Sequence, residues 1–143
     1  MSNWAKEVVS ITKQAFKNAG NKEVAQGAAN YMKNIAPFIG ISSPKRRALT
    51  KKAWQNLSVP TEKELIETAK LFWKLPQREF QYAACDLIGK YIGICTPKTL
   101  DQITVLIKSK SWWDSVDLLG TQVISPLTLK FPETRKTINK WNN

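Results

Sequence analysis

The sequence contains no histidine, and this absence removes whole classes of chemistry. Catalytic triads that use an imidazole base, histidine general acids and histidine metal ligands are all excluded. Any reaction must therefore depend on carboxylates, aromatic rings and basic side chains. We accordingly expect neither a metal ion nor any other cofactor.

Cysteine is scarce and long hydrophobic runs are missing. Cys85 and Cys95 are the only cysteines, and their spacing fits neither a disulfide framework nor a metal site. They are therefore predicted to be buried, reduced thiols. No apolar run approaches the roughly 18 residues of a membrane-spanning helix, and the first residues lack the pattern of a secretion signal. The sequence thus predicts a cytoplasmic protein that does not enter a membrane.

Acidic residues are few, and they are unevenly placed. The 143 residues include 22 Lys and Arg against 11 Asp and Glu, which gives a net charge of +11. Before residue 60 the only acids are Glu7 and Glu23. Such a field would attract a polyanion such as a nucleic acid. A soluble, lysine-rich surface without a ligand would account for the same charge.

Helical periodicity and helix caps run through the chain, and no alternating strand pattern interrupts them. We expect helices near residues 4–19, 22–33, 43–56, 61–73, 78–91, 97–107, 111–125 and 133–141. Pro44 and Pro76 each open the second helix of a pair and lie 32 positions apart (76 − 44). This layout predicts an all-α, HEAT-like solenoid of stacked antiparallel helix pairs in a single domain.

A basic turn opens the third expected helix. Ser43 is predicted as its N-cap and Pro44 as its first residue, so Lys45, Arg46 and Arg47 fall in the first turn. The helix dipole disfavours cations there, whereas a phosphate bound at the helix N-terminus would reverse that penalty. The turn is therefore a candidate phosphate site, and the alternative is an exposed basic turn without a ligand.

The segment from Lys110 to Leu119 combines aromatic and acidic residues. Ser111 and Asp114 have the spacing of a capping box, and Trp112 begins an apolar stripe that predicts a buried face. Trp113 and Asp117 are four apart, so an aromatic face and a carboxylate lie side by side on that helix.

A cation fits between such an aromatic face and a carboxylate. A purine alkylated at N3 or N7 carries a positive charge and is a good leaving group, so its departure needs no general acid. A carboxylate near the sugar would stabilise the oxocarbenium character of the transition state and place a water. The alternative is that Asp117 pairs with a Lys or Arg.

Four segments, residues 31–34, 38–47, 75–81 and 110–117, together closely resemble the AlkD-like DNA alkylation repair glycosylases. The resemblance covers nearly the whole chain in the same order. It implies a HEAT-like helical fold, and excision of cationic N3- and N7-alkylpurines from duplex DNA. It also implies that the enzyme does not need to flip the damaged base into a pocket, unlike most glycosylases.

The resemblance also implies roles for particular residues. Trp113 and Asp117 match the catalytic residues of the family, and Tyr31 matches a residue that helps to position the substrate. Ser43 stands where the family has a threonine that contacts the DNA backbone, and Arg47 matches the arginine of that turn. Lys45 and Arg46 complete the basic turn that is expected to bind DNA.

The chain departs from the family pattern at its C-terminal end. It stops at residue 143, roughly where the family continues into further repeats with a catalytic-site arginine and a second tryptophan. We therefore expect residues 1–143 to form a truncated domain whose last repeat exposes an apolar face. This predicts self-association or low stability. The alternative function is a catalytically incomplete helical-repeat module that binds DNA or protein.

Overall fold

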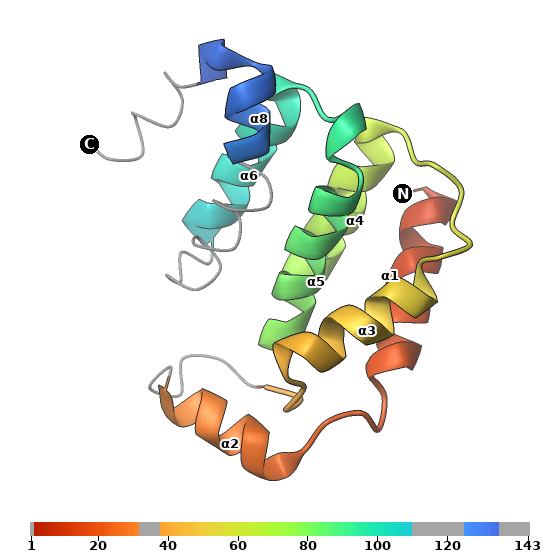
Figure 1. The fold of residues 1–143 in the computed structure, drawn as a ribbon, viewed down its shortest axis with the longest axis vertical. Coiled ribbons are helices and arrows are strands. Elements are labelled where there is room, and N and C mark those ends of the chain that lie inside the picture. Colours follow the sequence, from red (N-terminus) through yellow and green to blue (C-terminus); the bar gives the residue numbers. More distant parts are fainter. Residues whose placement is uncertain (1, 32–37, 110–124, 135–143) are drawn as a thin grey trace.

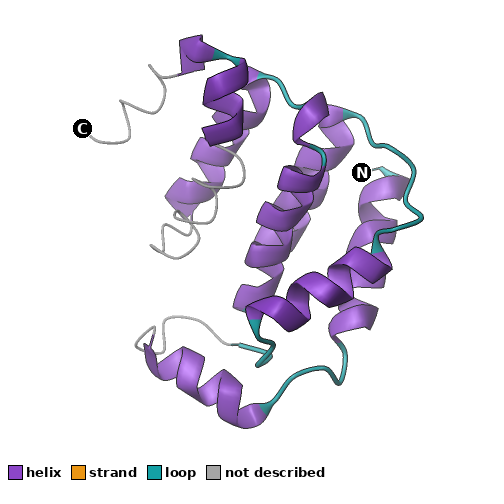
Figure 2. Ribbon diagram, viewed as in Figure 1, coloured by secondary structure: helices purple, strands orange, loops and turns teal. Residues whose placement is uncertain are grey.

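The computed structural model describes residues 2–31, 38–109 and 125–134, and every regular element in these ranges is a helix (Figure 2). The predicted all-α fold is therefore confirmed. The elements are α1 (Asn3–Phe16), α2 (Lys22–Tyr31), α3 (Ser43–Ala53), α4 (Glu62–Lys74), α5 (Arg78–Lys90), η1 (Ile92–Ile94), α6 (Pro97–Ser109), α8 (Ser125–Lys130) and η3 (Pro132–Thr134). The helix predicted from Ser111 lies outside the described residues, as does most of the one predicted for 133–141. Pro126 lies in the first turn of α8.

The helices stack in two rows (Figure 1). The first row consists of α1, α4 and α6, and the second of α3 and α5. Contacts run along each row and also across the pairs α1–α3 and α4–α5. Corresponding helices start 35 positions apart, from Ser43 to Arg78 and from Glu62 to Pro97 (78 − 43 and 97 − 62). The repeat is thus 35 residues rather than the predicted 32, because Pro76 lies in the turn before α5 whereas Pro44 lies inside α3.

The core centres on α5. Nine of its 13 residues are buried, since α5 packs against α4 of its own pair and against α3 in its row. In contrast, α4 buries one stripe, at Leu65, Thr68, Ala69, Phe72 and Trp73, which is the i, i+3, i+4, i+7 spacing of an amphipathic helix. A capping box of Thr61 and Glu64 opens α4, close to the start predicted for this helix.

The end of α1 differs from the prediction. The expected helix runs to residue 19, but α1 ends at Phe16, and Asn18 adopts the left-handed conformation with φ of 61°. Asparagine is one of the few residues that tolerate this conformation. Gly20 allows close packing after this turn, because a Cβ at this position would lie 2.1 Å from the carbonyl oxygen of Ile39.

Both cysteines are free and buried, as the sequence predicted. Burial raises the pKa of the Cys95 thiol above its ordinary value, and the charge of the Glu62 carboxylate raises it further. A hydrogen bond with Thr99 and the charge of Lys130 lower the pKa, but by less. Within the described ranges, no helix is long and apolar enough to cross a membrane.

Candidate nucleic-acid interface

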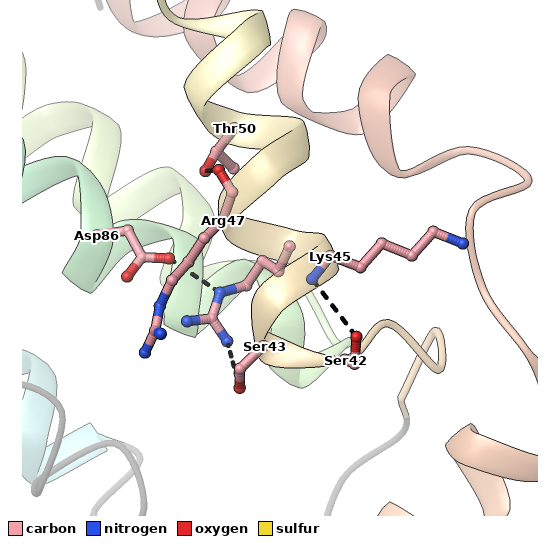
Figure 3. A network of polar contacts seen from close by, with 7 residues as sticks. Ser42, Ser43, Lys45, Arg47, Thr50 and Asp86 are labelled. Atoms are coloured by element: carbon pink, nitrogen blue, oxygen red, sulfur yellow. Dashed lines mark hydrogen bonds and ion pairs between the residues drawn. The ribbon is translucent and has the colours of Figure 1, made fainter.

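The basic turn at the start of α3 is built one residue earlier than predicted. Ser42, not Ser43, is the N-cap: its backbone is extended (φ −66°, ψ 156°) and its Oγ accepts a hydrogen bond from the N–H of Lys45 at 3.4 Å (Figure 3). Ser43 already belongs to the helix, and Pro44 follows it in the first turn. The first turn contains no acidic residue, so its charged side chains, Lys45 and Arg46, have the sign that the helix dipole disfavours there.

The three cations of the turn point in different directions, since consecutive residues of an α-helix are about 100° apart around the axis. Figure 3 shows Lys45 and Arg47 leaving α3 on opposite sides. Lys45 is exposed and its Nζ donates a hydrogen bond to the carbonyl oxygen of Ala19 at 2.7 Å. Arg47 is exposed on the side that faces α5.

Arg46 corrects the prediction that all three cations face DNA. Its side chain is buried, with 2% of the residue exposed, and its Nε donates to Oδ2 of Asp86 on α5 at 2.9 Å. A weaker hydrogen bond joins its Nη1 to Oγ of Ser43 at 3.4 Å. The guanidinium carbon lies 5.1 Å from the ring centroid of Tyr82, within cation–π range. Arg46 therefore ties α3 to α5 and is not available to a phosphate.

A groove lies between α3 and α5, and we call it the α3–α5 groove. Its volume is about 430 Å³, and it is lined by Arg47, Thr50, Lys51, Trp54, Asp86, Gly89 and Lys90. Three of these residues are exposed cations, namely Arg47, Lys51 and Lys90. The acid among the lining residues, Asp86, is already paired with Arg46. The groove thus presents three positive charges, and the carboxylate among its lining residues is already paired with Arg46.

Sequence reasoning missed two cations of this groove. Lys51 lies four residues after Arg47, one turn further along the same face of α3, so helical spacing could have identified it. Lys90 is the last residue of α5, and no local pattern connects it with α3. Only the packing of the two helices brings Lys90 to the groove.

A second groove lies on the first row, between α4 and α6. Its volume is about 480 Å³, and it is lined by Glu62, Lys63, Ile66, Glu67, Lys70, Lys98, Asp101 and Gln102. We call it the α4–α6 groove. Three lysines and three acids share it, so their formal charges balance.

Glu62 joins the two helices of the α4–α6 groove. Its carboxylate accepts hydrogen bonds from the N–H of Thr96 at 2.7 Å, from the Thr96 hydroxyl, and from the Thr99 hydroxyl at 2.6 Å. Burial raises the pKa of Glu62, but these hydrogen bonds, from Thr99 first, together with the charge of Lys98, lower it by more. The net effect is a pKa below the ordinary glutamate value.

The predicted catalytic residues Trp113 and Asp117 lie outside the described residues. Tyr31 is the last residue of α2, and its side chain also lies outside the described part. The roles predicted for these three residues therefore stay predictions from the sequence. The described residues supply the surface on which a polyanion could lie.

One comparison with known proteins adds to this picture. The family model for DNA alkylation repair enzymes matches residues 12–143. The match begins inside α1 and includes both rows of helices and both grooves. No curated protein matches the chain.

Proposed function

Because the chain belongs to the DNA alkylation repair enzyme family, we propose that it is a DNA glycosylase for cationic alkylated purines in duplex DNA. The family gives the chain a role in alkylation repair. The glycosylase reaction and the preference for bases alkylated at N3 or N7 are our proposal, and they follow the resemblance of residues 110–117 to the family motif.

The observation that carries this proposal is the charge of the α3–α5 groove. Arg47, Lys51 and Lys90 come from two helices and converge on one groove, with the carboxylate of Asp86 held by Arg46. Cations arranged in this way bind phosphates, and each phosphate contact releases condensed counterions from the DNA. Such contacts place the protein on the backbone without reading the sequence, as a repair enzyme requires.

The proposed reaction breaks the C1′–N bond between deoxyribose and the alkylated base. The bonding electron pair leaves with the base and neutralises its positive charge, so no proton has to be delivered to the base. Asp117 stabilises the positive charge that develops on the sugar and places the water that adds to C1′. As it adds, the water gives up a proton to the surrounding solvent, and the products are a free alkylated purine and an abasic site. Trp113 holds the cationic base against its ring face.

Base release from methylated duplex DNA tests this function. We expect the protein to release 7-methylguanine or 3-methyladenine, measured by chromatography of the free bases. Asp117→Asn should reduce the single-turnover rate by roughly 10²-fold or more, because an electrostatic contribution of this kind is lost. The matched control is Asp114→Asn, which changes an acid on the same segment that is predicted to cap the helix rather than to act on substrate.

The results separate the two functions that the sequence left open. Release that is undiminished in Asp117→Asn would sink the proposed mechanism. No release by the wild type, combined with DNA binding that depends on Arg47 and on salt, would instead identify a binding module that lacks a complete catalytic site. Arg47→Ala should weaken DNA binding and lower the salt dependence by about one phosphate contact.

A further inference from the structure

A buried carboxylate holds the segment that leads into the basic turn. Glu79, the second residue of α5, is 1% exposed. Its Oε1 accepts a hydrogen bond from the N–H of Ile39 at 2.9 Å, and its Oε2 accepts from Gly40 at 2.9 Å and from Ile41 at 3.2 Å. Three successive backbone N–H groups therefore converge on one side chain. Such an arrangement satisfies a buried carboxylate and at the same time fixes the backbone that donates to it.

The same segment is held on its other side by the start of α2. The N–H of Asn21 donates to the carbonyl oxygen of Gly40 at 3.0 Å. Gly40 has φ of +94°, and a Cβ there would lie 2.0 Å from the carbonyl oxygen of Asn21. Asn21 in turn caps α2, because its Oδ1 accepts from the N–H groups of Glu23 and Val24. Residues 39–41 are thus clamped between α5 and the start of α2.

The position of this clamp matters for the α3–α5 groove. Ile41 directly precedes Ser42, the N-cap of α3, and Arg47 lies on the second turn of that helix. Among the described helices, α2 stands apart from the two rows (Figure 1), and the hydrogen bond between Asn21 and Gly40 ties its beginning to this segment. One carboxylate on α5 therefore holds the segment that contacts the start of α2 and leads into the N-cap of α3.

We propose that Glu79 is a positioning residue for DNA binding: it holds residues 39–41 so that α3 presents Arg47 to a phosphate of the duplex. The inference rests on the proposed function, because it takes DNA as the ligand of the α3–α5 groove. Glu79 is fully enclosed by protein and touches no ligand itself. It acts through the backbone of residues 39–41.

The first row offers a matched control in Glu62. Its carboxylate also accepts three kinds of hydrogen bond, from the N–H and hydroxyl of Thr96 and the hydroxyl of Thr99, at the start of the neighbouring helix α6. Glu62 therefore ties one repeat to the next, much as Glu79 does, but it lies at the balanced α4–α6 groove. A loss of DNA binding caused by general loosening should follow from either substitution. A loss caused by the misplacement of Arg47 should follow only from changing Glu79.

The test is the affinity of the whole chain for duplex DNA, measured by fluorescence anisotropy over a series of salt concentrations. Glu79→Gln should raise the dissociation constant roughly tenfold at low salt and lower the salt slope by about one, as Arg47→Ala does. The double variant should bind no more weakly than either single variant, because both remove the same contact. Glu79→Asp, which keeps the charge, should recover part of the affinity. Glu62→Gln should leave both the affinity and the slope unchanged.

Three results would overturn the inference. The first is a wild-type affinity and salt slope in Glu79→Gln, and the second is full additivity with Arg47→Ala. The third is an equal loss in Glu62→Gln. If Glu79→Gln does not fold, Glu79→Asp combined with Arg47→Ala gives the same coupling measurement. The proposal that the α3–α5 groove binds DNA is tested separately, because it is contradicted if Arg47→Ala alone leaves DNA binding unchanged.

Discussion

The two described grooves are similar in size but differ in charge: the α3–α5 groove is basic, whereas the formal charges of the α4–α6 groove balance. The α3–α5 groove has a volume of about 430 Å³ and the α4–α6 groove about 480 Å³. Both are lined by three cations. In the α4–α6 groove three acids accompany the lysines, whereas in the α3–α5 groove the one carboxylate among the lining residues, Asp86, is bound to a fourth cation, Arg46.

The difference begins at the helix starts. The first turn of α4 carries Glu62 and Glu64, which suit the positive end of the helix dipole, while the first turn of α3 carries no acid. A fold alone does not require this difference, because both helices have a serine or threonine N-cap. The cations in the first turn of α3 lower the stability of the helix slightly, and they give this surface an attraction for anions. The cations of the α3–α5 groove therefore stay largely unbalanced, whereas those of the α4–α6 groove are matched by acids.

The largest effect is expected from removing Asp86, the carboxylate of the α3–α5 groove that pairs with the buried Arg46. Asp86→Ala leaves the Arg46 guanidinium enclosed without its partner, and this should lower the free energy of unfolding by about 3 kcal/mol. Urea denaturation followed by circular dichroism measures the change. Asp101→Ala, at an exposed acid of the α4–α6 groove, should stay within about 0.5 kcal/mol of the wild type. Equal losses in the free energy of unfolding from the two variants would contradict the inference that the ion pair between Asp86 and Arg46 stabilises the fold.

A second prediction compares the two grooves as DNA-binding surfaces. Replacing Arg47, Lys51 and Lys90 with Ala should weaken duplex binding roughly 10²-fold at 0.1 M salt and lower the salt slope by about three, one for each phosphate contact. The matched triple variant replaces Lys63, Lys70 and Lys98 of the α4–α6 groove. It removes the same net charge but no phosphate contact, so it should change the slope by less than one. Identical losses of affinity from the two triple variants would show that DNA binding depends only on the total charge of the protein.

The sequence predicted the helix starts better than the helix ends, for a physical reason. The caps that open α4 and α6 are local, so Thr61 and Thr96 could be identified from a few neighbouring residues. The ends of α1 and α3 depend on tertiary packing. After Asn18 the chain runs against residues 39–41, and Trp54, at the end of α3, is buried in the core with its Nε1 donating to the Thr12 hydroxyl at 2.9 Å.

The same distinction applies to the candidate site. The basic turn was visible in the sequence, but the separation of Arg46 from Arg47 depends on which side of α3 faces α5. Lys90 reaches the groove, and Glu79 reaches residues 39–41, only through contacts between segments about 40 positions apart. Sequence patterns report residues that share one helix face. They do not report which distant side chain completes a groove or holds a turn in place.

The smallest effect is a pH dependence at the α4–α6 groove. The pKa of Glu62 is lower in the folded chain than its ordinary value of 4.5, because the hydrogen bonds from Thr99 and Thr96 outweigh the opposing effect of burial. The stabilisation is therefore fully present above pH 4.5 and is lost as the pH falls through the folded pKa.

Glu62→Gln should be less stable than the wild type by about 1 kcal/mol at pH 7, because solvent screens a half-exposed carboxylate, and the gap should close below pH 4.5. Thr99→Val removes the strongest donor and should reduce the same pH dependence in part. A gap that stays constant from pH 7 to pH 3 would show that the hydrogen bonds of Glu62 do not depend on its charge.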